Sequence, residues 1–172
     1  MDTGGEILLA LIASRTDYRE DGHLIWVTVN GRPDLIGKEV GSVSSSDGYR
    51  YAKVKGKRVG VHRVVFYKHH GWCPAEVDHE NRIRTDNRIG NLRDPESHVN
   101  NLGNQSLQVG RSSKFKGVTW DRNRNKWIAS LKVDRRTVFL GRFTDETCAA
   151  KAYNQAAGAR FGKFANLNEV EQ

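Results

Sequence analysis

Apolar positions recur with helical spacing in two stretches of the N-terminal part of the chain. The first covers 7–14 and predicts an amphipathic helix. In the second, the apolar residues fit the period of a helix better than that of a strand, and they are Val61, Val64, Val65 and Phe66. Gly71 follows at the position where a helix commonly ends. We therefore expect helices around 7–14 and from about 61 to 70.

Between these helices the pattern favours strands. A run rich in β-branched and aromatic residues covers 24–29 and follows the turn signal Asp21-Gly22. A second β-favouring stretch lies around 49–54 and ends at a Lys-Gly-Lys turn, 55–57. This first part of the chain, up to residue 71, is therefore predicted to be mixed α and β.

The last third has a different pattern. Three candidate strands, 115–121, 126–133 and 136–140, are joined by polar turns and precede an alanine-rich helix over about 145–160. Strict alternation in the second strand places Trp127, Ala129, Leu131 and Val133 on one face and Lys126, Ile128, Ser130 and Lys132 on the other. We expect a small three-stranded antiparallel sheet that packs on one helix and leaves its other face free.

These elements predict an α+β fold in two parts. We place the first domain at 1–104, with an α/β portion at 1–71 and a segment at 72–104 that is rich in Asn, Asp and Arg. Small polar residues over 105–113 indicate a linker, and 114–168 forms the second domain. At 172 residues the chain has room for two small domains with modest cores.

Charge is concentrated in the second domain. The net charge is +8, and residues 111–163 hold 13 Lys and Arg against 4 Asp and Glu. A solvated surface usually mixes both signs, whereas a phosphate backbone is bound chiefly through Lys and Arg. This distribution favours a polyanion as the partner, and the resemblances given below imply that the polyanion is double-stranded DNA.

No other partner or compartment signal is found. The longest apolar run, 7–13, is too short to span a bilayer and has acidic residues before it, so we expect no membrane segment and a cytoplasmic chain. Cys73 and Cys148 are far apart and form no Cys-x-x-Cys pair, which argues against a disulfide framework and a zinc ribbon. We expect no small-molecule organic cofactor, and the oligomeric state stays open.

Groups suited to phosphodiester hydrolysis gather between residues 77 and 101. Hydrolysis needs a base that activates water and a cation that neutralises the developing charge. The adjacent Asp78 and His79 point to opposite sides if they lie on a strand, so one can face a metal ion and the other a water. A helix that begins near Asp94-Pro95 would bring Asn100 back towards that strand.

These residues resemble the HNH endonucleases, in particular the phage-type homing endonucleases with an H-N-N variant of the motif. The resemblance implies a ββα-metal fold and covers roughly 18–104. It implies His79 as general base, Asp78 and Asn100 as metal ligands, and Asn91 as the residue that braces the hairpin and orients the base. The implied cofactor is Mg²⁺ or another divalent cation such as Mn²⁺, because a hard cation prefers oxygen ligands.

Other polar residues of this segment have structural interpretations. Asn87 is interpreted as a turn residue and Asn101 as a helix-surface residue, with Asn101 in reserve as a ligand if the register differs by one. His62 and Arg63 are interpreted as scaffold residues or phosphate contacts. His98 lies two residues too early for the ligand position.

The last third resembles the plant-type apetala/ethylene-response-factor DNA-binding domain. The residues that carry the likeness include Phe115-Lys116-Gly117-Val118, Phe139-Leu140-Gly141 and Phe164-Ala165-Asn166. Positions that correspond to the family's groove-facing residues are Lys116, Thr119, Asp121, Ser130, Lys132, Thr137 and Phe139. Phosphate contacts from the turns are expected at Arg122, Arg124, Arg135 and Arg136.

Two functions remain open at this stage. In the first, the chain is a metal-dependent endonuclease that nicks or cleaves DNA at a site chosen by its C-terminal domain. In the second, it is a DNA-binding transcriptional regulator whose nuclease part is an inactive scaffold. The Asp78, His79, Asn91 and Asn100 set favours the first.

Overall fold

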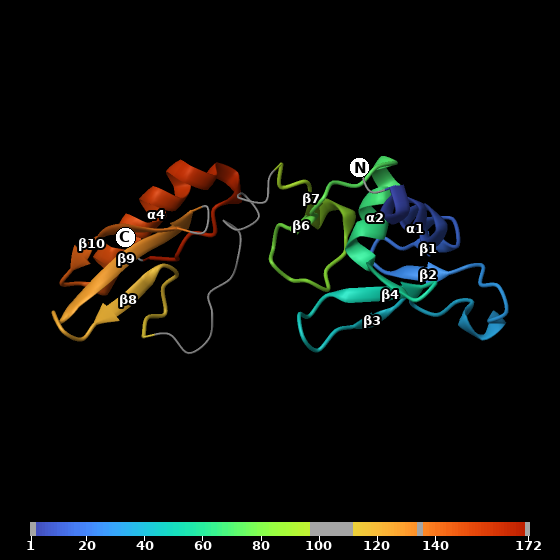
Figure 1. Ribbon diagram of the computed structural model, residues 1–172, viewed down its shortest axis with the longest axis horizontal. Coiled ribbons are helices and arrows are strands. Elements are labelled where there is room, and N and C mark those ends of the chain that lie inside the picture. Colours follow the sequence, from blue (N-terminus) through green and yellow to red (C-terminus); the bar gives the residue numbers. More distant parts are fainter. Residues whose placement is uncertain (1–2, 97–111, 134–135, 171–172) are drawn as a thin grey trace. The chain divides into compact units, whose positions relative to one another are not determined.

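The computed structural model describes residues 3–96, 112–133 and 136–170 (Figure 1). The chain forms two compact units, Met1–Pro95 and Glu96–Gln172, which we call unit 1 and unit 2. Over the described residues the fold is mixed α and β, with three α-helices and several small antiparallel sheets. The predicted linker 105–113 and the helix expected to carry Asn100 lie wholly or mostly outside these residues. Across the described ranges, none of the helices has the length and apolar character that crossing a bilayer requires.

The core of unit 1 is built around helix α2 (Val61–His70), which packs against α1 (Thr3–Ala13) (Figure 1). Its apolar side is fully buried, as the spacing predicted, and Gly71 ends the helix with a positive φ of 75°. The helix expected around 7–14 is present as α1, which begins at Thr3, four residues before the apolar run. Helix α2 also contacts the three-stranded sheet of this unit and the hairpin that follows the helix, both described below, so it lies at the centre of the unit.

Two small antiparallel sheets complete the frame of unit 1. One pairs β1 (Thr16–Tyr18) with β2 (Leu24–Trp26), and the other has the order β3 (Ser42–Val43), β4 (Arg50–Val54), β5 (Lys57–Gly60). The strand expected over 24–29 ends at Trp26, because β1 offers only three residues for pairing and the chain then bends towards the short 3₁₀ helix η1 (Pro33–Leu35). The turn expected at 55–57 joins β4 to β5 and has positive φ at Lys55 and Gly56.

A short hairpin follows α2. Strand β6 (Asp78–His79) pairs with β7 (Leu92–Arg93), in the register Asp78 opposite Arg93 and His79 opposite Leu92. The connecting segment is a long loop that ends in a 3₁₀ turn, η2 (Ile89–Asn91). Leu92 and the preceding Val77 are buried in the unit 1 core, so apolar residues attach the hairpin to α2.

Unit 2 consists of a three-stranded antiparallel sheet and one long helix. The strand order is β10 (Arg136–Phe143), β9 (Lys126–Val133), β8 (Val118–Asp121), and α4 (Glu146–Phe161) covers one face of the sheet (Figure 1). The Asp145 carboxylate caps α4 by accepting a hydrogen bond from the backbone N–H of Cys148. A 3₁₀ turn, η3 (Gly162–Phe164), follows the helix.

The alternation expected along β9 is observed. Ala129 and Leu131 are buried against α4, and Trp127 and Val133 pack at the edges of the same cores. The third strand extends to Phe143, beyond the end expected at residue 140, because a bulge lets it continue. The pairing runs Phe139 with Ser130 and then Gly141 with Ala129, so Leu140 is the extra residue.

Candidate active site and nucleic-acid interface

The loop between β6 and β7 is fastened by the side chain of Asn91. Its Oδ1 accepts a hydrogen bond from the backbone N–H of Asn81 at 2.9 Å, and its Nδ2 donates to the carbonyl oxygen of Asp86 at 2.8 Å. The side-chain amide of Asn91, at the end of the loop, is therefore bonded to the backbone near the start and in the middle of the loop. This is the hairpin-bracing position that the sequence predicted for Asn91, and its contacts are with the backbone of the loop and not with an imidazole.

His79 lies on β6 with only 3% of its surface exposed. Its Nε2 is 3.1 Å from Oδ1 of Asn87, which is equally buried and comes from the same loop. Burial lowers the pKa of His79 from its ordinary value, and the hydrogen bond to Asn87 and the charge of Asp78 act in the opposite direction. The Asn87 side chain thus fixes one ring nitrogen of His79 in place.

Asn87 was not foreseen as a site residue. The sequence interpretation made it a turn residue, and its backbone does lie in a turn, with its N–H donating to the Thr85 carbonyl oxygen at 3.1 Å. Its side chain, however, points inward to His79. Gly22 explains part of this position: the turn before β2 lies so close that a Cβ on Gly22 would come within 2.6 Å of the Arg88 nitrogen. That contact joins two residues that are 66 positions apart in the chain.

Two further rings surround the imidazole of His79. The ring centroid of His62, from α2, is 5.2 Å away, and that of Tyr49, from the turn before β4, is 5.7 Å away. Burial lowers the pKa of His62 to about 3, so this imidazole stays neutral, and its Nδ1 has no hydrogen-bond partner among the described residues. The scaffold interpretation of His62 agrees with this position. Nothing in the sequence pattern indicated Tyr49.

The carboxylate of Asp78 points away from His79, to the other side of the hairpin. Asp78 is buried, and its Oδ2 accepts from the Nε of Arg93 at 2.9 Å, directly across the strand pair. The second expected metal ligand, Asn100, lies outside the described residues, as do Asn101 and His98. Within the described ranges no group of three or more His, Cys, Asp and Glu side chains is placed to hold a metal ion.

Ion pairs and hydrogen bonds between side chains hold the rest of the loop in place. Asp86 forms an ion pair with Arg88 at 2.6 Å and accepts from the Asn81 side chain at 2.7 Å. The hydrogen bond from Arg88 holds the pKa of Asp86 far below its usual range. On the other side of the loop, Arg84 donates to the carbonyl oxygen of Asp47 and stacks over Tyr49, with 5.0 Å between its Cζ and the ring centroid. The loop is therefore fixed by side-chain contacts more than by burial.

In unit 2 the sheet face opposite α4 carries most of the residues expected to contact DNA. Thr119 lies beside the buried Val118 and therefore on the outer side, where its register partner is Ile128. The expected residues that share this face are Thr119, Ser130, Lys132, Thr137 and Phe139. Phe139 is 55% exposed, which makes it a surface residue and not part of the core.

Arg142 belongs to the same face and was missed by the sequence pattern. It pairs in register with Ile128, its guanidinium carbon is 5.0 Å from the centroid of the Phe139 ring, and it forms an ion pair with Asp121 at 3.3 Å. Phe139 and Arg142 are three residues apart, an odd spacing that would put them on opposite faces of a regular strand. The bulge at Leu140 returns Arg142 to the outer side.

The remaining residues expected to contact DNA are distributed around this face. Arg122 and Arg124 lie in the turn between β8 and β9, and Arg124 is 3.5 Å from Asp121. Arg136 is exposed at the start of β10, and Arg135 lies outside the described residues. Lys116 precedes β8, with its backbone bonded on both sides to the side chain of Asn168.

Comparisons with known proteins find two similarities. Residues 59–94, which contain α2, β6, the loop and β7, match the family model described as HNH endonuclease. Over 61 residues, or 34% of this chain, the sequence is 38% identical to the ethylene-responsive transcription factor ERF024 of Arabidopsis thaliana. The chain spans about a third of that protein's length, since the match covers 33% of it. A nuclease-family signature therefore falls on the elements that hold His79.

Proposed function

We propose that this chain is an HNH-type DNA endonuclease of the homing kind, in which unit 1 hydrolyses a phosphodiester bond and unit 2 selects the site. The proposal is carried by the environment of His79: a buried imidazole, held at Nε2 by Asn87, on the hairpin that matches the HNH endonuclease model. The likeness to a plant transcription factor and the basic character of residues 111–163 support DNA as the partner.

The arrangement of His79 suits a general base. A neutral imidazole has one protonated nitrogen and one lone pair, and the carbonyl-type oxygen of Asn87 accepts only from the protonated one. With Nε2–H donating to Asn87, the lone pair is at Nδ1, which is buried in this structure, so water must gain access to it before it can act as a base. Nδ1 takes a proton from water, the water oxygen bonds to phosphorus, and the bond from phosphorus to the leaving sugar oxygen breaks.

A divalent cation fits this chain through its oxygen donors. Asp78, which precedes His79 in the chain, offers a carboxylate on the other side of the hairpin, and Mg²⁺ is commonly held by one or two protein oxygens together with water and substrate phosphate. Asn100, outside the described residues, is the proposed second ligand. When bound, such an ion neutralises charge on the phosphate and on the leaving oxygen. Arg93, whose Nε is 2.9 Å from Oδ2 of Asp78, orients that carboxylate.

Cleavage by purified full-length protein tests the proposal. Random-sequence DNA is incubated with Mg²⁺ or Mn²⁺, cleaved molecules are selected, and their ends are mapped on both strands. We expect discrete cut sites, and we expect His79→Ala to abolish cleavage while leaving DNA affinity nearly unchanged, because a base contributes on the order of 10²–10⁴-fold to the rate and little to binding.

His23→Ala is the matched control. His23 is an exposed histidine of the same unit, bonded to Glu39 at 2.6 Å, and its loss should leave cleavage intact. Full cleavage by the His79→Ala variant would show that His79 is not the general base. Tight DNA binding by the wild-type protein without cutting under any divalent cation would support the alternative of a DNA-binding regulator with an inactive nuclease scaffold.

A further inference from the structure

The sheet β3–β4–β5 has one face that packs on the core and one that does not. Ala52 and Val59 are buried partners in the register, and Val54 packs against the same core. On the opposite side, Lys53 pairs in register with Arg58, and both are exposed. We call the surface formed by Tyr49, Tyr51, Lys53 and Arg58 the outer face.

The outer face combines aromatic rings with guanidinium groups. The Arg58 guanidinium carbon is 4.0 Å from the centroid of the Tyr51 ring, and Arg84 covers Tyr49 in the same way from the loop after β6. The two tyrosine rings meet edge to face, with centroids 6.5 Å apart. Stacking of this kind holds an arginine in place while its N–H groups remain able to bind phosphate.

The nearest carboxylate that the structure describes at the outer face is that of Asp47, which accepts from the Tyr51 hydroxyl at 3.0 Å and interacts electrostatically with Arg58 without forming an ion pair. Lys53, Lys55, Lys57 and Arg58 lie on the β4–β5 hairpin, all are exposed, and none forms an ion pair with a residue that the structure describes. By contrast, Arg50, Arg88 and Arg93 of the same unit are each paired with a carboxylate. The hairpin is thus a concentrated positive surface.

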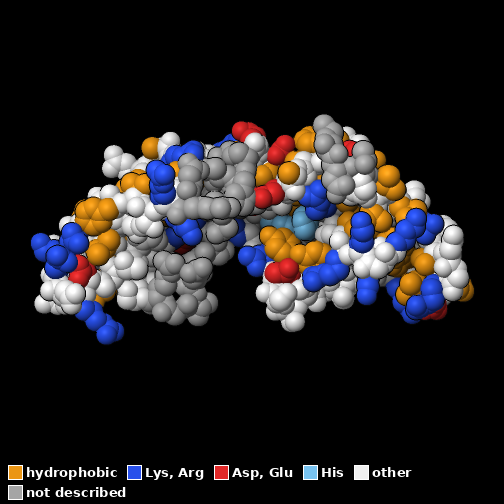
Figure 2. Space-filling model, in the orientation of Figure 1, with side chains coloured by type: hydrophobic (Ala, Val, Ile, Leu, Met, Phe, Trp, Pro, Cys, Tyr) orange, Lys and Arg blue, Asp and Glu red, His pale blue; other side chains and the backbone are white. Residues whose placement is uncertain are grey.

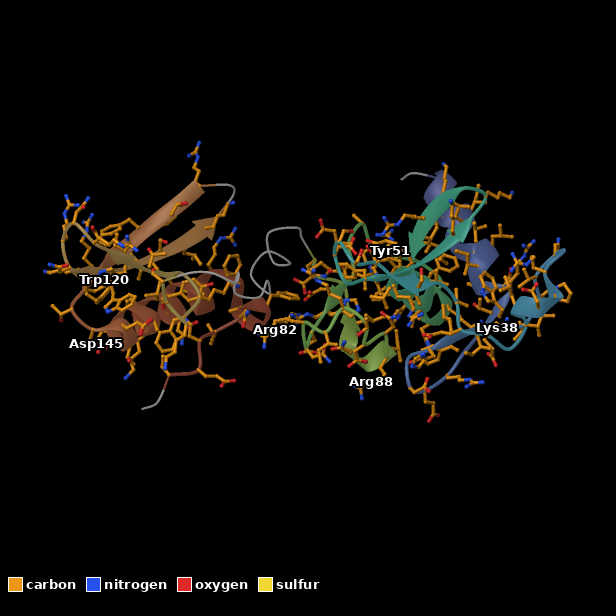
Figure 3. All side chains as sticks on the ribbon, turned by 90° about the horizontal axis from the view of Figure 1, so that it is seen from below. Lys38, Tyr51, Arg82, Arg88, Trp120 and Asp145 are labelled. Carbon is orange, nitrogen blue, oxygen red and sulfur yellow. The ribbon has the colours of Figure 1, made fainter. Side chains whose placement is uncertain are left out.

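The outer face begins at the candidate active site. Tyr49 is in ring contact with His79, and Tyr51 lies two residues further along the strand (Figure 3). At roughly 3.3 Å per residue, the turn at Lys55 lies about 20 Å from Tyr49 along β4, which corresponds to about six base pairs of DNA. In the space-filling view, a small area of pale-blue histidine atoms on this unit lies among hydrophobic side chains and Lys and Arg side chains (Figure 2).

We propose that the outer face, extended by Lys55 and Lys57, binds the sugar–phosphate backbone of double-stranded DNA next to the scissile phosphate. This inference rests on the proposed function, because His79 identifies the bound polyanion as the nuclease substrate. The arginines cover the tyrosine rings, so the face offers charge and hydrogen-bond donors to phosphate and not open rings to unstacked bases. Unit 1 therefore has a DNA-binding surface of its own, in addition to the sheet face of unit 2.

The test removes two of these charges and compares them with two matched charges elsewhere in unit 1. The double variant Lys53→Gln with Arg58→Gln is compared with Arg32→Gln with Lys38→Gln, which lowers the net charge equally. Arg32 and Lys38 are also exposed, Lys38 lies at the opposite end of the unit from Arg82 (Figure 3), and the Arg32–Asp34 pair is a surface ion pair of small energetic effect. Both are made in a His79→Ala background, so that DNA stays intact.

Affinity for a target-containing duplex is measured by fluorescence anisotropy over a range of salt concentrations. Loss of two phosphate contacts should reduce the slope of log affinity against log salt by about 1.8 and weaken binding at 0.15 M salt by about 30-fold. Arg58→Lys, which keeps the charge, should retain the slope. Hydroxyl-radical footprints should lose protection beside the cut site only in the Lys53 and Arg58 double variant.

An unchanged slope and footprint in that variant would overturn the inference and leave an acidic protein surface as the occupant of the outer face. An equal loss in the Arg32 and Lys38 control would overturn it as well, because the effect would then be one of net charge. Circular dichroism checks that each variant is folded. Since binding is measured without cleavage, failure of the nuclease proposal would be seen separately, as a wild-type protein that binds the duplex and does not cut it.

Discussion

At the scale of single residues, two asparagines of one loop make different contacts around the same imidazole. Asn91 bonds to the backbone at Asn81 and Asp86, whereas Asn87 is in direct contact with the His79 ring. A buried N–H left without an acceptor costs about 1–3 kcal/mol, so the ring tautomer follows from the position of the Asn87 oxygen. Asn87 is therefore a positioning residue, and it sets which nitrogen of His79 can accept a proton.

Substitution of Asn87 tests this role through the tautomer of His79. In the native protein and in Asn87→Asp, which keeps an oxygen acceptor, the ring nitrogen shifts of His79 in ¹⁵N NMR should show a protonated Nε2 and an unprotonated Nδ1. Asn87→Leu has similar volume but no acceptor, and it should give mixed tautomers and cleavage slower by on the order of 100-fold.

Asn123→Leu is a control for loss of an exposed asparagine, since Asn123 lies in the turn after β8. A native spectrum with the proton on Nδ1 would show that Asn87 does not choose the tautomer. A folded Asn87→Leu variant that cleaves at the native rate would lead to the same conclusion.

At the scale of elements, local pattern was a good guide wherever one face of an element is buried. The apolar residues of α2 and the alternation along β9 predicted both elements closely, because the burial of each residue follows from its place in the period. The bulge in β10 could not be predicted in this way. It depends on how β10 pairs with β9, and Gly141, with a φ of 144°, gives no signal for it in the spacing of apolar residues.

Two glycines of unit 2 should respond in opposite directions to the same change. Gly158 is inside α4, and nothing lies within 4 Å of a Cβ placed there, so Gly158→Ala should stabilise the unit by about 1 kcal/mol through helix propensity. Gly117 has a φ of 74°, and a Cβ there would come within 2.0 Å of the Tyr153 ring and 2.7 Å of the Ser130 carbonyl oxygen. Gly117→Ala should therefore destabilise it by about 2 kcal/mol or more.

Urea unfolding measures both changes in stability against the same parent protein. In the parent and in both variants, the other two tryptophans are replaced by phenylalanine, so that the fluorescence of Trp120 and Trp127 reports on unit 2. A Gly158→Ala variant less stable than the parent would mean that the helix is constrained at this position by a contact not described above. A neutral Gly117→Ala would contradict the close packing of Tyr153 under the sheet.

At the scale of the whole molecule, the two units have separate cores and, in the proposed function, separate tasks. The core of unit 1 gathers around α2, and the two clusters of unit 2 lie between its sheet and α4. Of the residues proposed for chemistry, Asp78, His79 and Asn91 are in unit 1, whereas Asn100 falls within the range of unit 2 and outside the described residues. The sheet face proposed for site selection is in unit 2. We expect affinity and chemical rate to respond to different sets of substitutions.

Lys132→Gln with Arg136→Gln tests that separation. Both cations are exposed on the strands of unit 2, Lys132 on the outer sheet face and Arg136 at the start of β10. Their loss should weaken DNA binding by about 10-fold or more at physiological salt. The single-turnover cleavage rate at saturating DNA should stay within about twofold of the parent, because no group near His79 has changed. Lys151→Gln with Arg160→Gln, on the α4 side, is the control of equal charge. A large fall in the saturated rate would contradict the division of tasks.

The sequence by itself determined the elements of each unit and brought Asp78, His79 and Asn91 together as a motif, because periodicity and short spacings are properties of one continuous segment. The tertiary structure alone decided which side chains surround His79. The Gly22 turn lies against the backbone of Asn87, and Tyr49 and His62 reach the His79 ring from the turn before β4 and from α2. Such neighbours depend on strand register and on the close packing of segments far apart in the chain, which no local pattern contains.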